Sequence, residues 1–385
     1  MNDYSTLELT LRDILRVISP LEEDWAKRFQ FINELRAVVE SVESLRGATV
    51  EPYGSFVSNL FTRWGDLDLS IELPNGSFIS SAGKKLKQTL LGDLQKALRR
   101  RGGWYKLQFI ANARVPILKF ESNYLNISCD VSINSLNGQM KSKLLFWINE
   151  IDGRFRNMVK EWAKTHGIND SKSGTLNSYC LSMLIIFHFQ TCVPPLLPPL
   201  KEIYPGNIVD DLIGVRAVAE RHIEEICAEN INKFRSDKSR KINRSSLSEL
   251  FISFLKKVED PFEQPVNTAR TVSIRHLTRI SEAFQGTHYA LTSRNQSHSS
   301  LIPTLVRPHV SQSIWRTPNN ASGYNASYSR PRPQMHRAVH SPSQVLHQFQ
   351  NMRIDRRPSN VTTQRMVSNA SNSQGQRAWR PRSDW

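Results

Sequence analysis

The feature that most constrains this chain is a stretch of twenty residues that runs from Gly54 to Leu73. Its second half alternates strictly, with polar residues at 66, 68, 70 and 72 and a leucine or isoleucine at each position between them. Such a period of two predicts a strand with one face in a core. Asp66 and Asp68 then lie side by side, and ionising both is costly unless a cation is close. Hard divalent cations that prefer oxygen ligands, Mg²⁺ or Mn²⁺, meet that requirement.

The residues before this strand predict a phosphate-binding turn. Residues 49–53 have the composition of a short strand, Gly54-Ser55 forms a tight turn, and residues 56–62 suit one or two helical turns. Backbone N–H groups and a hydroxyl at the start of a helix favour a phosphate. A phosphate-binding turn followed by a metal-binding carboxylate pair is the arrangement that nucleotidyl transfer needs, because two metals activate a hydroxyl and hold the triphosphate.

A second alternating segment, residues 125–133, adds a third carboxylate. Asp130 shares the polar positions with Asn126, Ser128 and Ser132, while Leu, Ile, Cys and Val occupy the others. A lone Asp-x-Asp pair is usually a solvated strand edge. A third acid on a second strand, together with the Gly-Ser turn, favours a three-carboxylate metal site over structural charge.

Gly54-Ser55, Asp66-Leu-Asp68 and Cys-Asp130-Val-Ser together resemble the motifs of the DNA polymerase β-like nucleotidyltransferase superfamily. More narrowly, the chain resembles the noncanonical poly(A)/poly(U) polymerases, in which the runs VKEWAK (159–164), GTLNSY (174–179) and EDPFE (259–263) recur in this order. Over residues 8–285 it is most similar to the plant HEN-suppressor type, which uridylylates unmethylated small RNAs. The resemblance implies an α+β fold with a polymerase β-like mixed sheet, a helical central domain and a disordered C-terminal tail.

The resemblance also implies roles for individual residues. Asp66, Asp68 and Asp130 hold the Mg²⁺ or Mn²⁺ ions, and Asp130 helps to deprotonate the attacking 3′-hydroxyl. The nucleotide is bound by Gly54, Ser55, Lys160, Lys164 and Ser178 at the triphosphate, and by Tyr179, Asp260 and Glu263 at the base. The residues alone leave simpler interpretations open. Lys160 and Lys164 can be an exposed lysine pair, Ser178 a helix cap and Tyr179 a core residue. Asp260 and Glu263 can be acids that stabilise a helix N-terminus.

The implied reaction is RNA 3′-terminal uridylyl transfer by two metals, from UTP to small RNAs or RNA fragments, which promotes their decay. The implied partners are UTP, single-stranded RNA 3′ ends and Argonaute-type small-RNA complexes, in the nucleus and the cytoplasm, including RNA-decay granules. Two alternatives remain: an ATP-using poly(A) polymerase, and a catalytically impaired RNA-binding isoform.

The length of 385 residues suits two domains and a tail. We expect a catalytic domain at 1–140, whose N-terminal helices can pack on a second domain, a shortened helical nucleotide-recognition domain at 141–285, and a disordered tail at 286–385. The tail has thirteen arginines, no lysine and two acids, so it carries +11 of the net charge of +16. Arginine with scattered aromatics suits sequence-indifferent RNA contact, and a purely solubilising tail is the alternative. The basic helix expected at 81–101 is a solvated face or part of an RNA groove.

The four cysteines include no Cys-x-x-Cys pair, and no signal peptide stands at the N-terminus. These features predict a reducing, intracellular compartment without structural zinc. No apolar run approaches the roughly 20 residues of a membrane span, so we expect no membrane partner.

Four positions depart from the family pattern. The helix that leads to Lys160 is about one turn shorter, which would rotate the lysines. The segment between residue 257 and Asp260 lacks a strand that relatives have. Lys141 replaces a ribose-contacting Asn, and Val266 replaces the His that favours uracil over adenine. The preference for UTP therefore rests on overall similarity and not on a base-reading residue.

Overall fold

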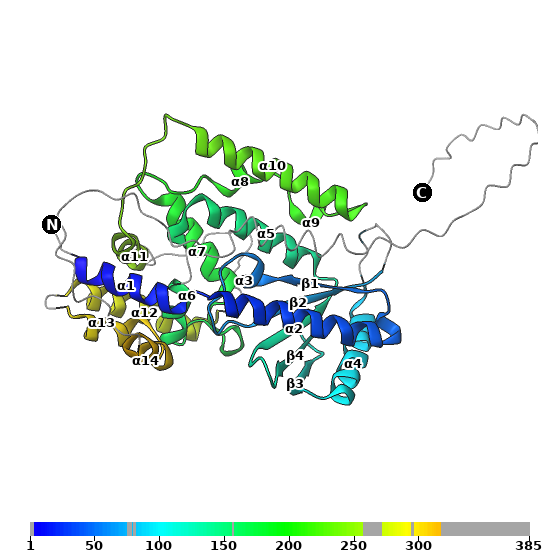
Figure 1. Ribbon diagram of the computed structural model, residues 1–385. Helices are drawn as coiled ribbons and strands as arrows, with labels where there is room; N and C mark the ends of the chain where they lie inside the picture. The colour runs from blue at the N-terminus through cyan, green and yellow to red at the C-terminus, as the bar shows by residue number, and fades with distance from the viewer. Residues whose placement is uncertain are drawn as a thin grey trace, which may run out of the picture. The chain divides into compact units, whose positions relative to one another are not determined.

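The computed structural model describes residues 4–74, 79, 82–155, 158–256, 272–293 and 296–316 (Figure 1). All of them belong to one compact unit, Met1–Arg332. Asp260, Glu263 and Val266 lie outside the described residues, as do residues 317–385 of the predicted tail.

A five-stranded mixed sheet carries the predicted acidic residues, and its order is β1-β2-β5-β4-β3. Its strands are β1 (Thr49–Tyr53), β2 (Leu67–Glu72), β3 (Trp104–Ile110), β4 (Ile117–Ser122) and β5 (Ser128–Ile133). Only the central pair, β2 and β5, is parallel, and the other pairs are antiparallel. The two alternating segments of the sequence are thus neighbours, and their register places Asp68 directly beside Asp130.

The apolar face of the sheet packs against α2 (Glu22–Ser41) and α4 (Lys84–Arg101). Leu67, Leu69 and Ile71 of β2 are fully buried there, as the alternation predicts. The sequence placed helices on this face only, but α3 (Gly54–Val57) and α5 (Leu136–Ile151) also cover β1 and β2 on the other side. Burying that polar face is possible because its groups pair with one another: the Ser70 hydroxyl donates to Glu72 and accepts from the Ser135 N–H.

The remaining elements are helical. They are α1 (Ser5–Ile18), α6 (Met158–Thr165), α7 (Ser178–Thr191), α8 (Leu200–Ile203), α9 (Ile208–Asp211), α10 (Arg216–Ser236), α11 (Leu247–Lys256), α12 (Ile274–Thr292), α13 (His298–Leu305) and α14 (Pro308–Arg316), with 3₁₀ turns at Glu43–Leu45, Gly153–Phe155 and Ser171–Ser173. One core surrounds Trp162 of α6 and includes Leu7, Leu11 and Ile14 of α1 (Figure 1). The first helix therefore packs with helices that follow the sheet in sequence. None of the described helices is long and apolar enough to cross a membrane.

The segment from residue 286 to residue 316 differs from the disordered tail that the composition predicted. Residues 286–292 complete α12, and α13 and α14 follow. Their apolar side chains, Leu301, Ile302, Leu305, Val310 and Ile314, are buried in the same core as α1. Burial of this apolar stripe outweighs the Ser- and Arg-rich composition around it. The proposed boundary at 140/141 and the assignment of residues 141–285 to nucleotide recognition stay predictions.

Candidate active site

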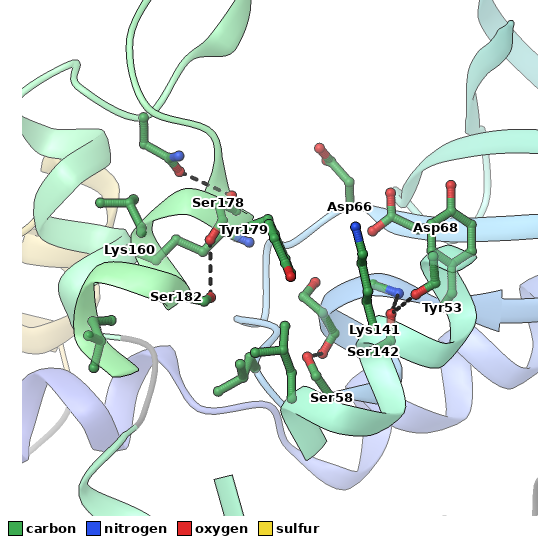
Figure 2. Close-up of a pocket in the computed structure, with 18 of the residues that line it drawn as sticks. Tyr53, Ser58, Asp66, Asp68, Lys141, Ser142, Lys160, Ser178, Tyr179 and Ser182 are labelled. Carbon is green, nitrogen blue, oxygen red and sulfur yellow. Dashed lines mark hydrogen bonds between the residues drawn. The ribbon is translucent and has the colours of Figure 1, made fainter. Parts of the chain in front are cut away.

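A pocket of about 530 Å³ opens where the ends of β1 and β2 face α5, α6 and α7 (Figure 2). Eight of the eleven predicted site residues line it: Gly54, Ser55, Asp66, Asp68, Lys160, Lys164, Ser178 and Tyr179. In Figure 2, Asp66 and Asp68 stand on one side of the pocket, with Lys160, Ser178 and Tyr179 on the other. Residues more than 90 positions apart in the sequence thus place carboxylates opposite ammonium groups across one cavity.

Asp68 is crowded by its neighbours. Burial and, after it, the negative charge of Asp130 raise its pKa to about 7, against the opposing effect of Lys160. Gly54 comes so close that a Cβ on it would stand 2.1 Å from Asp68 Oδ2, and its φ of +67° is one that glycine adopts most readily. The Gly-Ser turn therefore packs its backbone against the carboxylate, which a larger residue would prevent.

Asp130 does not line the pocket, although it is the register partner of Asp68. Its Oδ1 lies 2.7 Å from Nζ of Lys119 on β4, and its pKa is raised by burial in spite of that lysine. Among the described residues, no three His, Cys, Asp or Glu side chains already converge as a metal site. The donors nevertheless fit a divalent cation in kind, because Asp130 and Asp66 are close enough for their charges to raise the pKa of Asp68, and three carboxylates supply hard oxygen ligands.

Lys160 and Lys164 form the opposite wall. Burial and, after it, the positive charge of Lys164 lower the pKa of Lys160 to about 8. Burial likewise lowers the pKa of Lys164. Although the sequence before Lys160 is shorter than in the family, both lysine side chains line the pocket. Beside them, the Ser178 hydroxyl donates to Asn169 Oδ1 over 3.3 Å.

Two pocket residues on α5 were not predicted as binding residues. The Gly54 N–H donates to Ser142 Oγ over 2.7 Å, which ties the Gly-Ser turn to α5. Lys141, the residue in place of the family Asn, directs Nζ over the Tyr179 ring at 5.2 Å from its centroid. Figure 2 shows its side chain rising toward the space between Tyr179 and Asp68. The ammonium group of Lys141 thus lies over the ring of Tyr179, the ring that was predicted to stack on the base.

Buried polar contacts fix the elements that carry these residues. Arg28 of α2 donates to the Gly65 carbonyl over 2.7 Å and stacks its guanidinium over Phe61, which holds the loop before Asp66. Arg216 of α10 binds both Glu72 of β2 and Gln139 of α5. No local sequence signal identifies such pairs, because their partners are 33 or more positions apart.

Comparison with known proteins agrees with this geometry. The family model described as poly(A) RNA polymerase, mitochondrial-like, central palm domain matches residues 7–150. The Arabidopsis thaliana protein HESO1 is 47% identical over 425 residues, which cover 98% of this chain and 80% of that protein. Because this alignment is longer than the chain, HESO1 has segments that the chain lacks. The Schizosaccharomyces pombe poly(A) RNA polymerase cid11 is 29% identical over 52% of this chain and 42% of its own length, so the chain spans less than half of that relative.

Solved structures share the fold. A structure of Cid1, described by its RNA terminal uridylyl transferase activity, has a TM-score of 0.60 at 20% identity and covers 80% of this chain and all of its own. A structure of mtPAP in complex with UTP has a TM-score of 0.58 at 18% identity over 79% of this chain and 71% of its own.

Proposed function

Because the chain belongs to the noncanonical poly(A)/poly(U) polymerase family of nucleotidyltransferases, we propose that it is an RNA 3′-terminal uridylyltransferase. It would add UMP from UTP to the 3′ ends of small RNAs or RNA fragments and release pyrophosphate, which promotes RNA decay. The observation that carries this proposal is the single pocket in which Asp66 and Asp68 face Lys160 and Lys164. Opposed charges of this kind suit a metal-bound triphosphate.

The chain's own residues divide the work. Asp66, Asp68 and Asp130 would hold Mg²⁺ or Mn²⁺, for which Asp130 would have to exchange the contact with Lys119. Divalent cations there would favour the alkoxide form of the RNA 3′-hydroxyl and neutralise phosphate charge. Lys160, Lys164, Ser55 and Ser178 would orient the triphosphate in line with that hydroxyl, and Tyr179 would stack on the base.

The choice of UTP is supported by the 47% identity to HESO1 over nearly the whole chain. Leu60, Leu145, Leu181 and Ile185 supply apolar surface to the described part of the pocket, and apolar contact does not by itself separate uracil from adenine. Asp260 and Glu263, which we propose at the base, lie outside the described residues. An Argonaute-type complex as partner, and the nucleus and cytoplasm as locations, belong to the same proposal.

The test is an extension assay on a labelled single-stranded RNA, in which UTP and ATP compete at equal concentration in the presence of Mg²⁺. We expect uridylate addition, and its loss in Asp68→Asn and Asp130→Asn at unchanged far-UV circular dichroism. Addition of adenylate would instead establish the poly(A) polymerase. RNA binding without extension by either nucleotide would establish the impaired RNA-binding isoform. The observation that favours this alternative is that HESO1 has segments that this chain lacks.

A further inference from the structure

The helix that carries the two pocket lysines also carries a buried carboxylate. Glu161 follows Lys160 directly, and its side chain is only 1% exposed. On an α-helix, residues three apart lie on adjacent sides of the cylinder, so Glu161 is within reach of Lys164. A carboxylate in that position competes with a bound phosphate for the ammonium group.

Arg307, near the C-terminal end of the described residues, forms an ion pair with Glu161. The guanidinium of Arg307, between α13 and α14, donates from Nε to Oε1 over 2.8 Å and from Nη2 to Oε2 over 2.9 Å. This two-bond fork is the strong geometry for an arginine and a carboxylate. Burial alone would raise the pKa of Glu161, but the hydrogen bonds and charge of Arg307 outweigh it, and the pKa is lowered. Glu161 is therefore a charged group whose two oxygens are both satisfied by Arg307.

Helices α12 and α13 also contact α6 and the residue that follows it at two further points. His166 Nε2 lies 2.9 Å from the Thr304 carbonyl, and the Trp162 indole donates to Thr287 Oγ1 over 2.9 Å. These contacts span 125 or more positions in the sequence. Helices α12 and α13 thus hold one side of α6 while its other side presents Lys160 and Lys164 to the pocket.

We propose that Arg307 is a positioning residue for the triphosphate: by binding Glu161 it keeps Lys164 directed at the pocket and available to phosphate. The proposal rests on the proposed nucleotidyl transfer, in which the pocket lysines receive the triphosphate. Without Arg307, the buried carboxylate turns to Lys164, whose charge already acts on it, and the helix loses one of its anchors. The predicted consequence is specific to ligands with β- and γ-phosphates.

The experiment measures binding of UTP and of UMP to the full chain by calorimetry with Mg²⁺, alongside thermal unfolding, in four variants. Arg307→Met removes the fork, and Glu161→Gln with Arg307→Met removes the competing carboxylate as well. Glu161→Gln alone removes the charge of the carboxylate and keeps Arg307. Arg154→Met is the matched control, because Arg154 makes a similar fork to Asp152 at the same 28% exposure but does not line the pocket.

We expect Arg307→Met to weaken UTP binding by about tenfold, the loss of one charge-assisted contact, and to change UMP binding by less than twofold. The double variant should recover UTP binding to within about twofold of the wild type while its Tm stays low, and Glu161→Gln should bind UTP normally. Arg154→Met should lower Tm without changing either Kd. A merely structural role predicts no recovery in the double variant.

Equal weakening of UTP and UMP, or a double variant as weak as Arg307→Met, would overturn the proposal. If Arg307→Met does not fold, Arg307→Lys provides the test. A lysine ammonium leaves one oxygen of Glu161 unpaired, so we expect a UTP affinity between those of the wild type and of a variant without the pair. A UTP affinity equal to that of the wild type would refute the proposal. If UTP binds as expected but no variant, including the wild type, extends RNA, the proposed function fails and the positioning role stands.

Discussion

Gly54→Ala is the substitution whose effect the structure specifies most closely. Two penalties apply to it. Its φ of +67° lies in the left-handed region, which costs an L-residue about 1–2 kcal/mol. The added Cβ would also stand 2.1 Å from Asp68 Oδ2 and 2.8 Å from its Cγ, so the carboxylate must move by about 1 Å to reach an ordinary contact distance.

The two penalties act on different observables. The conformational cost should appear as a loss of about 1–2 kcal/mol in the free energy of unfolding. The displacement of Asp68 should lower RNA extension by about a hundredfold, since a shift of about 1 Å in a reacting group has that order of effect. Gly214→Ala is the matched control, because Gly214 has a φ of +72° and nothing within 4 Å of the position of a Cβ.

Urea unfolding and single-turnover extension separate these effects. Gly214→Ala should lose stability to a similar degree and keep its extension rate. Gly54→Ala should lose both. Near-normal extension by folded Gly54→Ala would refute the reasoning that the close approach of this backbone to Asp68 matters for the chemistry.

Three further predictions concern separate parts of the chain. Lys141→Met should tighten binding of uridine, which has no phosphate, by about two- to fivefold, because the ring of Tyr179 no longer holds a cation; unchanged uridine affinity in calorimetry would contradict this. Since the pKa of Glu161 is lowered on folding, its ion pair contributes fully above the unfolded value of 4.5, and this contribution is lost as the pH falls below it. The difference in unfolding free energy between wild type and Glu161→Gln should therefore shrink from pH 6 to pH 3.5, and a constant difference would argue against the charged pair. Removal of residues 317–385, which hold ten arginines and two acids, should flatten the salt dependence of RNA binding, and an equal slope would show that the tail only aids solubility.

The sequence by itself determined the parts of the site that have a local period. The alternation of residues 66–73 and 125–133 predicted two strands with their acids on one face. Both strands form, but β2 begins at Leu67, one residue after Asp66, and β5 begins at Ser128, so residues 125–127 are not part of the strand. The i,i+4 spacing of Lys160 and Lys164 likewise placed both side chains on one side of a helix. These features are local because a strand or a helix repeats its own geometry every two or 3.6 residues.

The tertiary structure alone decided which distant residues complete the site. Lys119 beside Asp130, Ser142 on the Gly54 N–H and Arg307 on Glu161 join positions 11, 88 and 146 apart. A pair of this kind leaves no period in the sequence, because it depends on the order of strands and on which helix faces meet. The same reason explains residues 298–316. Their polar composition predicted disorder, and their few apolar side chains are buried only because the fold brings them against α1, nearly 300 positions away, and against α6 and α12.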